Sequence, residues 1–453
     1  MANTRLTRTV GTPTLNTKYT FSFWVKRSKL TYSDAFMVDG RVDANNRFKI
    51  AFQVADKLEI WNSHSGSDTF AINTNRLFRD PAAWMHIVLA VDTTDGTAGD
   101  RVKLYINGTR ETSFASSTNP SQNDANNVIN ESGAGIHIGD YSGGSNAFDG
   151  CMSHFHFCDG TALAPTVFGE TDSTTGEWKI KTSPSFTLGN NGFTILKDGS
   201  TITDQSTNSN DFSLASGTLT NTEDCPSNVF ATFNPLSSNN PTLSGGSLIA
   251  TASGGYRYAL STIAPTTGKY YAEFKLTTDS GYTNFGVENI SKGSFFSQYN
   301  SNSYIGEYNS GVAYQPGSSS LYHNGSSSGS YGGAVSGDII GIAMDLDNGF
   351  IYWSKNGTFL NSGVPTSAGT GTGGYAISNI ANSSGGNTYA MGVSLANTGG
   401  GRSISANFGN GYFGTTAITT NSGNGYAGAE GKSKFNYQPP TGFSALTTRG
   451  LNQ

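Results

Sequence analysis

Residues 19–27 read Tyr19-Thr20-Phe21-Ser22-Phe23-Trp24-Val25-Lys26-Arg27, and this stretch decides the fold class. Apolar side chains recur in it at a period of two, which is the pattern of a β-strand with one face in a core. The same period returns at Val102-Lys103-Leu104-Tyr105-Ile106, which runs directly into Asn107-Gly108. Asn-Gly between strands is the strongest short signal for a β-hairpin. The stretch therefore predicts antiparallel sheets.

The second half of the chain repeats this pattern. Tyr270, Ala272, Phe274 and Leu276 alternate along one face, and Phe350-Ile351-Tyr352-Trp353-Ser354-Lys355-Asn356-Gly357 again joins a strand to Asn-Gly. We predict an all-β protein with two tandem antiparallel β-sandwiches joined by an extended connector. The predicted boundaries are residues 1–183 for the first sandwich, 184–241 for an extended connector, 242–437 for the second sandwich and 438–453 for a C-terminal tail.

Composition fits turn-rich sheets and excludes several classes of protein. The 453 residues include 58 Gly without a collagen period, and 27 basic against 32 acidic side chains give a net charge of −5. The longest basic cluster is Lys26-Arg27-Ser28-Lys29, too short for a nucleic-acid-binding surface. Because Met1–Leu6 lacks an apolar signal region and no apolar run approaches ~20 residues, we expect synthesis in a cytoplasm and no membrane insertion.

Cysteine and histidine spacing gives no metal or disulfide pattern. Cys151, Cys158 and Cys225 are an odd set without paired C-x-x-C spacing, so we expect three thiols. His154, His156 and Cys158 share one predicted strand, which spreads them along ~13 Å and prevents a tetrahedral site. We expect no cofactor and no metal.

Paired carboxylates of a glycoside hydrolase are the sharpest enzymatic alternative. The nearest pairs, Asp92 with Asp95 and Asp345 with Asp347, lie where predicted strands enter turns, and turns select Asp. Gly325-Ser326-Ser327-Ser328-Gly329 has the letters of a nucleophile elbow without its strand-to-helix setting. We expect a protein that is not an enzyme.

A tyrosine-rich stretch between Phe295 and Tyr331 is the best candidate for a binding surface. Rigid tyrosines interleaved with Ser, Asn and Gly resemble an antibody paratope. The candidate ligand- or partner-binding residues are Tyr299, Tyr304, Tyr308, Tyr314 and Tyr322. The alternative is that several of them pack in the sandwich or against a neighbouring subunit.

The first module resembles the laminin-G-like, concanavalin-like sandwich, a jelly-roll fold, as it is found in marine bacteriophage proteins. The resemblance rests on residues 23–27, 84–87, 102–108, 148–150 and 157–160. Its most specific part is Phe168-Gly169-Glu170-Thr171-Asp172 with Gly176-Glu177-Trp178. Such folds often bind Ca²⁺ at a rim, to which Asp140 and Asp149 could contribute oxygen ligands.

The remainder of the chain resembles the same phage proteins and, within them, a SPRY domain. Gly268–Phe274, Gly337–Asp345 and Tyr352–Gly357 carry the SPRY resemblance, and Cys225–Phe230 and Phe435–Leu446 carry the phage-type resemblance of the connector and tail. Both folds are binding scaffolds whose partners are set by loops.

The resemblance implies a structural protein of a phage particle, a tail fibre, knob or capsid decoration. It would be assembled in the host cytoplasm and located in the virion, as a homo-oligomer in contact with other virion proteins. Host-surface polysaccharide is the second expected partner, and nucleic acid is not expected. The alternatives are a glycan-degrading depolymerase and a cement protein without a ligand.

Overall fold

The computed structural model describes residues 4–199, 201–237, 239–278, 281–291, 302–380, 387–396, 401–419 and 425–452. These residues form β-strands and short 3₁₀ turns, and none of their helices is long and apolar enough to cross a membrane. The chain divides into two compact units, unit 1 (Met1–Asn221) and unit 2 (Thr222–Gln453). The predicted all-β class is confirmed.

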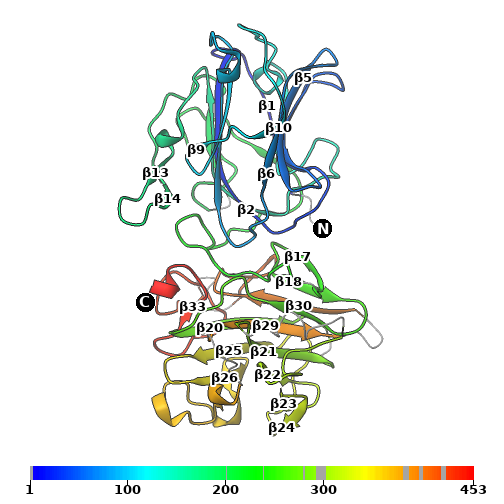
Figure 1. The fold of residues 1–453 in the computed structure, drawn as a ribbon, viewed down its shortest axis with the longest axis vertical. Coiled ribbons are helices and arrows are strands. Elements are labelled where there is room, and N and C mark those ends of the chain that lie inside the picture. The colour runs from blue at the N-terminus through cyan, green and yellow to red at the C-terminus, as the bar shows by residue number, and fades with distance from the viewer. Residues whose placement is uncertain are drawn as a thin grey trace. The chain divides into compact units, whose positions relative to one another are not determined.

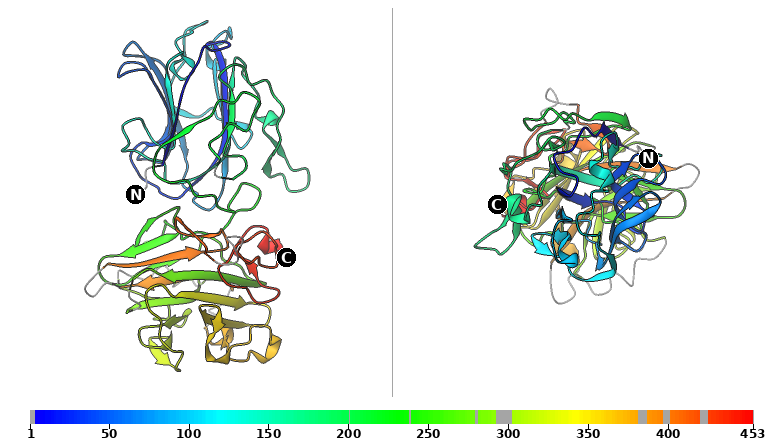
Figure 2. Two further views of the ribbon diagram at one scale, coloured as in Figure 1. Left: turned by 180° about the vertical axis from the view of Figure 1, so that it is seen from behind. Right: turned by 90° about the horizontal axis from the view of Figure 1, so that it is seen from above.

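Unit 1 is a sandwich of two antiparallel sheets that face each other (Figures 1 and 2). The eight-stranded sheet has the order β10 (Phe114–Thr118), β6 (Ser67–Leu77), β5 (Lys57–His64), β4 (Arg47–Phe52), β3 (Ala35–Arg41), β11 (Gly135–Ile138), β1 (Arg5–Thr9) and β16 (Ser213–Ser216). The six-stranded sheet has the order β15 (Phe193–Ile195), β12 (Gly150–Asp159), β2 (Lys18–Arg27), β7 (Met85–Asp92), β8 (Val102–Ile106) and β9 (Thr109–Arg110).

The alternating residues of the opening stretch form the core of unit 1, as predicted. Phe21 and Phe23 of β2 pack in one buried cluster with Phe48 and Ile50 of β4 in the opposite sheet. Phe21 stacks on Phe48 with ring centroids 6.0 Å apart. The inward faces of both sheets therefore share one apolar layer, which is the usual arrangement of a sandwich.

The predicted extended connector at residues 184–241 is wrong. Its strand β15 pairs with β12, and its strand β16 pairs with β1 on the other side of the sandwich. Phe193 and Phe212 are buried in the core of unit 1, 4.8 Å apart between ring centroids. Since this segment adds apolar side chains and a strand to each sheet, it belongs to the fold up to Asn221.

A hairpin lies over the outer face of the six-stranded sheet. It consists of β13 (Gly169–Thr171) and β14 (Trp178–Ile180) and contains most of the motif at residues 168–178 (Figure 1). Trp178 packs so tightly on the Asn107-Gly108 turn that a Cβ at Gly108 would come within 2.4 Å of the indole. Gly108 is therefore required for two reasons. Its φ of 75° allows the predicted hairpin turn, and its lack of a side chain leaves room for the Trp178 ring.

Unit 2 is a second pair of sheets. The larger has the order β17 (Thr242–Ser244), β18 (Ile249–Ala252), β30 (Arg402–Asn407), β20 (Lys269–Leu276), β25 (Ile339–Asp345), β26 (Phe350–Lys355) and β27 (Thr358–Phe359), with β28 (Tyr375–Ala376) on β26 and β33 (Ser444–Ala445) on β20. The smaller has the order β19 (Arg257–Leu260), β29 (Tyr389–Leu395), β21 (Thr283–Asn289), β22 (Gly311–Gln315), β23 (Ser320–His323) and β24 (Ser326–Ser328). A separate pair joins β31 (Tyr412–Phe413) to β32 (Thr416–Ala417).

Seven 3₁₀ turns complete the described regular structure. They are η1 (Ala98–Asp100), η2 (Val128–Asn130), η3 (Pro165–Val167), η4 (Leu360–Ser362), η5 (Ala368–Thr370), η6 (Ile377–Asn379) and η8 (Gly450–Asn452).

The predicted C-terminal tail at residues 438–453 is also wrong, because it is built into unit 2. Its strand β33 pairs in parallel with β20, and Phe443 and Leu446 are buried. Just before it, the main-chain N–H groups of Asn436 and Tyr437 each donate a 2.7 Å hydrogen bond to the fully buried carboxylate of Glu273. Burial raises the pKa of Glu273 to about 7.

Candidate functional site

Four tyrosines gather on the side of the smaller sheet of unit 2 that faces away from its main core. The ring centroids of Tyr256 and Tyr304 lie 4.8 Å apart, those of Tyr256 and Tyr282 lie 6.3 Å apart, and those of Tyr304 and Tyr322 lie 6.1 Å apart. We call these four residues the tyrosine cluster. Tyr282 is 49% exposed, and the other three are partly exposed. The cluster therefore presents aromatic surface to solvent.

A layer of buried amides supports the tyrosine cluster. Gln315 forms a hydrogen bond with Tyr256, and its Nε2 donates to Asn284 Oδ1 at 2.8 Å. Asn284 in turn donates from Nδ2 to the carbonyl of Ile305, 3.1 Å away, in the chain segment that carries Tyr304. Because buried amide networks with satisfied partners fix side-chain positions, this layer holds the rings in place.

The hydroxyl groups of Tyr256 and Tyr304 remain protonated near neutral pH. Burial raises the pKa of Tyr256 to about 12, with a further increase from the neighbouring Tyr304. Burial and the nearby carboxylate of Glu307 raise the pKa of Tyr304. A neutral phenol can both donate and accept hydrogen bonds. The cluster thus combines apolar ring faces with two-way hydrogen-bonding groups, which is a surface suited to a polyhydroxylated ligand.

The structure separates the five tyrosines predicted from sequence. Tyr304 and Tyr322 lie in the cluster, and Tyr308 packs beside it against a small buried group that includes Ile305. Tyr314 is fully buried in the main core and donates its hydroxyl hydrogen to the carbonyl of Gly332, which removes it from any contact surface. Tyr299 lies outside the described residues.

Sequence reasoning missed two members of the cluster. Tyr256 precedes β19 and Tyr282 precedes β21, so neither belongs to the tyrosine-rich stretch. The available signal was that both stand beside glycine at the entry to a strand, as Gly255-Tyr256 and Gly281-Tyr282.

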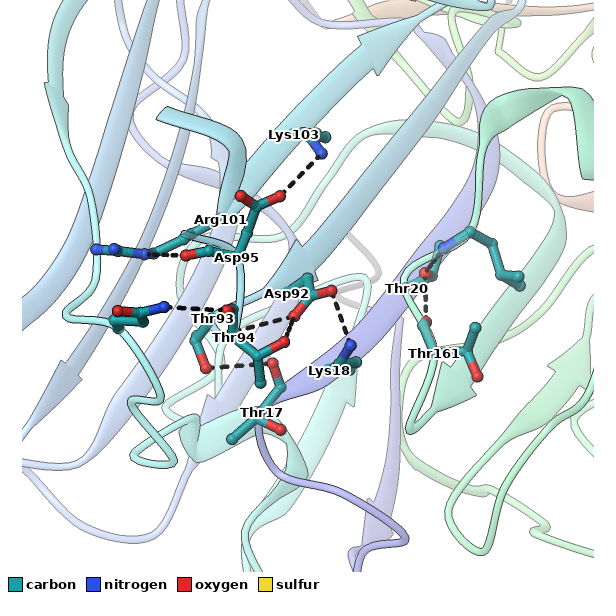
Figure 3. Close-up of polar contacts among 12 residues, drawn as sticks. Thr17, Lys18, Thr20, Asp92, Thr93, Thr94, Asp95, Arg101, Lys103 and Thr161 are labelled. Carbon is teal, nitrogen blue, oxygen red and sulfur yellow. Dashed lines mark hydrogen bonds and ion pairs between the residues drawn. The ribbon is translucent and has the colours of Figure 1, made fainter. Parts of the chain in front are cut away.

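The acidic pairs considered for catalysis are engaged in turns. Asp92 accepts a 3.0 Å hydrogen bond from the main chain of Thr94 and pairs with Lys18 at 2.9 Å (Figure 3). Asp95 caps the N–H of Thr97 and lies 3.7 Å from Lys103. Both carboxylates therefore stabilise the turn after β7, the role that the sequence predicted for them.

The second acidic pair, in unit 2, is also engaged in structural hydrogen bonds, one within a turn and one to a distant segment. Asp345 accepts a hydrogen bond from the N–H of Asn348 at 2.9 Å and pairs with Lys269 at 3.0 Å. Asp347 accepts a hydrogen bond from the N–H of Gly268 at 2.7 Å.

The candidate metal ligands do not form a cluster. Among the described residues, no group of three or more His, Cys, Asp or Glu side chains is placed to hold a metal ion. His156 is buried and bonds Thr194, and His154 lies in a β-bulge at a φ of 47°, which breaks the predicted alternation with Cys158. Asp140 accepts hydrogen bonds from two main-chain N–H groups, and it is not joined to Asp149 in a described acidic cluster. All three cysteines are free thiols, as predicted.

A buried serine–histidine pair in unit 1 was not predicted. Ser22 Oγ lies 2.8 Å from His86 Nε2, and the indole N–H of Trp178 points at His86 Nδ1 from 3.0 Å. Burial lowers the pKa of His86 to about 3, so the ring is neutral. An indole N–H only donates, so Nδ1 must accept and the ring hydrogen must be on Nε2. This hydrogen faces Ser22, so the ring cannot accept a proton from the serine as a catalytic base would.

Comparison with known proteins agrees with the sandwich class of the first module. Residues 4–168 match a laminin-G-type family model described as the concanavalin A-like lectin/glucanases superfamily. No curated protein matches the chain. The match confirms the predicted concanavalin-like fold of unit 1.

Three solved structures illustrate what parts of the chain are similar to. The SPRY domain of human HERC1 is 20% identical, with 38% of this chain and 96% of that chain covered and a TM-score of 0.30. A heptameric SAP-like pentraxin from Limulus polyphemus is 16% identical, with 36% and 72% covered and a TM-score of 0.27. Domain 4 of the arabinanase AbnA from Geobacillus stearothermophilus, solved with arabinotriose, is 21% identical, with 33% and 64% covered and a TM-score of 0.25.

Proposed function

We propose that this protein is a non-catalytic carbohydrate-binding component of a bacteriophage particle. The observation that carries the carbohydrate-binding part is the tyrosine cluster, in which partly exposed rings with protonated hydroxyls stand on a fixed amide layer. Ring faces pack against the C–H faces of sugars, and phenols exchange hydrogen bonds with sugar hydroxyls. The lectin-type family match of unit 1 supports the same ligand class.

The proposal of a non-catalytic role rests on the hydrogen bonds that already engage the candidate catalytic side chains. Asp92, Asp95 and Asp345 accept hydrogen bonds within turns, and Asp347 accepts one from the main chain of Gly268. His86 presents its ring hydrogen to Ser22. A glycoside hydrolase needs one carboxyl group to donate a proton while another attacks or activates water. Carboxylates that are held by main-chain N–H groups and lysines are poor proton donors.

The assignment to a phage particle rests on sequence resemblance alone. Its most specific motif, at residues 168–178, forms the hairpin that covers the six-stranded sheet of unit 1. Mass spectrometry of purified particles tests this part, because a structural component copurifies with the particle at a fixed ratio to the other structural proteins. Its absence from intact particles would refute a virion role and leave carbohydrate binding to be judged separately.

A glycan array with the full-length protein tests carbohydrate binding, followed by calorimetry with the best oligosaccharide. We expect the double substitution Tyr282→Ala and Tyr304→Ala to weaken binding by about 10- to 100-fold, since two partly exposed aromatic rings that contribute about 1 kcal/mol each sum to about 2 kcal/mol. Tyr105→Ala is the matched control, because Tyr105 is a partly exposed tyrosine of β8 in unit 1. Equal binding by the double variant and the wild type would exclude the tyrosine cluster, and release of reducing ends would show a depolymerase instead.

A further inference from the structure

The outer face of the eight-stranded sheet in unit 1 carries an ordered row of polar and aromatic side chains. The strand registers place His137, Asp39, Lys49 and Trp61 opposite one another on β11, β3, β4 and β5. Their neighbours along each strand point into the core, so these side chains point outward. Three strand spacings of about 4.8 Å make the row about 14 Å long, which is the length of a short oligosaccharide.

Trp61 is partly exposed and stands beside cations. The guanidinium carbon of Arg47 lies 5.6 Å from the centroid of the Trp61 ring and 5.8 Å from that of Tyr141. The ammonium of Lys49 lies 5.5 Å from the Trp61 ring and is paired with Glu59. The Trp61 and Tyr141 rings thus bracket Arg47 on this sheet face.

Arg41 and Arg47 flank one buried carboxylate, and Arg5 lies beside the same loop. Arg41 is the cross-strand partner of Arg47, and Arg47 lies 3.7 Å from Asp39, whose side chain is buried. Arg41 reaches Ser142 Oγ at 3.3 Å, and Arg5 donates to the carbonyl of Tyr141 at 3.0 Å.

Carboxylates match only part of the positive charge on this face. The ammonium of Lys49 is paired with Glu59 and lies 3.7 Å from Asp34. Asp39 is the carboxylate that pairs with the arginine group, so the guanidinium groups outnumber it.

Two of these arginines have a buried donor that lacks an acceptor in the described part of the chain, and the neighbouring histidine is neutral. The Nε atoms of Arg5 and Arg47 are buried and have no hydrogen-bond acceptor within the described part of the chain. Burial, with Arg5 and Arg41 as further causes, lowers the pKa of His137 to about 4. The histidine is therefore neutral near pH 7 and adds no charge of its own.

We infer that this sheet face binds an acidic oligosaccharide, with a sugar ring stacked on Trp61 and its anionic group bound by Arg41 and Arg47. Guanidinium groups fit carboxylate and sulfate oxygens through paired N–H donors, and the indole offers a flat apolar face. The shared ligand chemistry is a pyranose that carries a carboxylate or a sulfate ester. This site, which we call the Trp61 face, lies in unit 1 and is distinct from the tyrosine cluster of unit 2.

Calorimetry with the full-length protein tests the inference with three probes: a hexa-uronate, a sulfated galactan hexasaccharide and a neutral glucan hexasaccharide. We expect at least one acidic probe to bind at least 10-fold more tightly than the neutral one, and to weaken as salt is raised because screening reduces charge attraction. The uronate and sulfate arms identify which anionic group is recognised.

Three variants locate the site. Arg41→Gln and Trp61→Ala should each weaken acidic-probe binding by about 10-fold or more, whereas Arg110→Gln, an exposed arginine of β9 on the opposite sheet, should not. Because Trp61→Ala could disturb the fold, its circular dichroism and melting temperature are compared with those of Arg41→Gln. The double variant Tyr282→Ala, Tyr304→Ala is titrated in parallel. Acidic-probe binding that falls in this variant but not in Arg41→Gln would place the binding at the tyrosine cluster and overturn the inference, so failure at one site is distinguishable from failure at the other. Binding of none of the acidic probes, binding equal to that of the neutral probe, or unchanged binding by Arg41→Gln would overturn the inference.

Discussion

Both units cover the outer face of one sheet with a later chain segment, but they bury opposite kinds of titratable group beneath it. In unit 1, Phe168 and Trp178 contact His86, and Phe168 also stacks on His156. In unit 2, the segment that contains Asn436 and Tyr437 closes over Glu273. The His86 ring in unit 1 is surrounded by aromatic side chains and accepts a hydrogen bond from Trp178, which favours its neutral form. The Glu273 carboxyl group in unit 2 accepts hydrogen bonds from main-chain N–H groups.

This difference shows that two sheets covered in the same way can have stabilities that depend on pH in opposite directions. Burial lowers the pKa of both His86 and His156 to about 3, which favours the neutral ring in the folded state. Burial raises the pKa of Glu273 to about 7, which favours its protonated form in the folded state. Acid should therefore weaken the covering segment of unit 1, and base should weaken that of unit 2.

The largest expected effect is the loss of the anchor in unit 2. Glu273→Ala leaves the N–H groups of Asn436 and Tyr437 and the amide of Asn407 without their buried acceptor. We expect unit 2 to lose about 3–5 kcal/mol of unfolding free energy. Chemical denaturation followed by hydrogen exchange and mass spectrometry measures each unit separately. Glu177→Ala, at an exposed position of unit 1, is the matched control, and a loss below about 1 kcal/mol in unit 2 would refute the anchoring role.

The next effect is the loss of the anchor in unit 1. Trp178→Ala removes the indole that packs on Gly108 and bonds His86, and we expect a loss of about 2–3 kcal/mol because Trp178 is only partly buried. The same measurement should show earlier exchange in residues 161–187 and an unchanged unit 2. Trp178→Phe keeps an aromatic ring without the N–H donor, so its stability should lie between those of Trp178→Ala and the wild type. Equal stability of Trp178→Ala and wild type would show that the hairpin does not need this contact.

A smaller change in stability, counted per pH unit, is expected from the opposite responses of the two units to pH. The stability that His86 and His156 confer as neutral rings is present above their unfolded pKa of about 6.5 and is lost toward pH 3, by up to about 1.4 kcal/mol per pH unit for each ring. The stability linked to Glu273 is present below pH 4.5 and declines as pH rises to about 7. Exchange rates measured from pH 4.5 to 7.5 should therefore move in opposite directions at β7 and at residues 434–437. A common direction in both regions, after correction for intrinsic exchange, would contradict the assignment.

The smallest expected effect comes from Ser22. Ser22→Ala removes the acceptor for the His86 Nε2 hydrogen, and we expect a loss of about 1 kcal/mol in unit 1. Nitrogen NMR of labelled histidine should show the hydrogen of His86 on Nε2 in the wild type. A hydrogen on Nδ1 would reverse the orientation of the pair and reopen a catalytic role.

Local patterns in the sequence predicted the strands whose alternation is long and whose turns are explicit. The strand β2 and the hairpins at Asn107-Gly108 and Asn356-Gly357 are examples, since these residues specify their own geometry. The strands β15 and β16 have three and four residues, and β16 pairs with β1 about 200 residues earlier in the chain. A strand that short has no readable period, so its partner could not be identified from sequence.

The candidate site was predictable in part for the same reason. A high density of tyrosine identified Tyr304 and Tyr322, but Tyr256 and Tyr282 join them only through tertiary contacts. Tyr314 was predicted to be a binding residue because it belongs to the tyrosine-rich stretch. Its strand, Gly311–Gln315, is buried along its whole length and has no polar alternation that could have marked the inward face. Composition could show that tyrosines are abundant there, but it could not show which face of the sheet each one occupies.

Unit 1 is completed by strands that come late in its sequence, and this limits where such a module can be cut and transferred to another protein. The family match ends at residue 168, yet the strands that complete both sheets continue to Ser216. A recombination event or a designed fusion that cuts at the end of the recognised module would leave Phe155 and Phe157 without Phe193 and would expose two sheet edges to aggregation. A cut between Asn221 and Thr222 would keep both sheets of unit 1 complete.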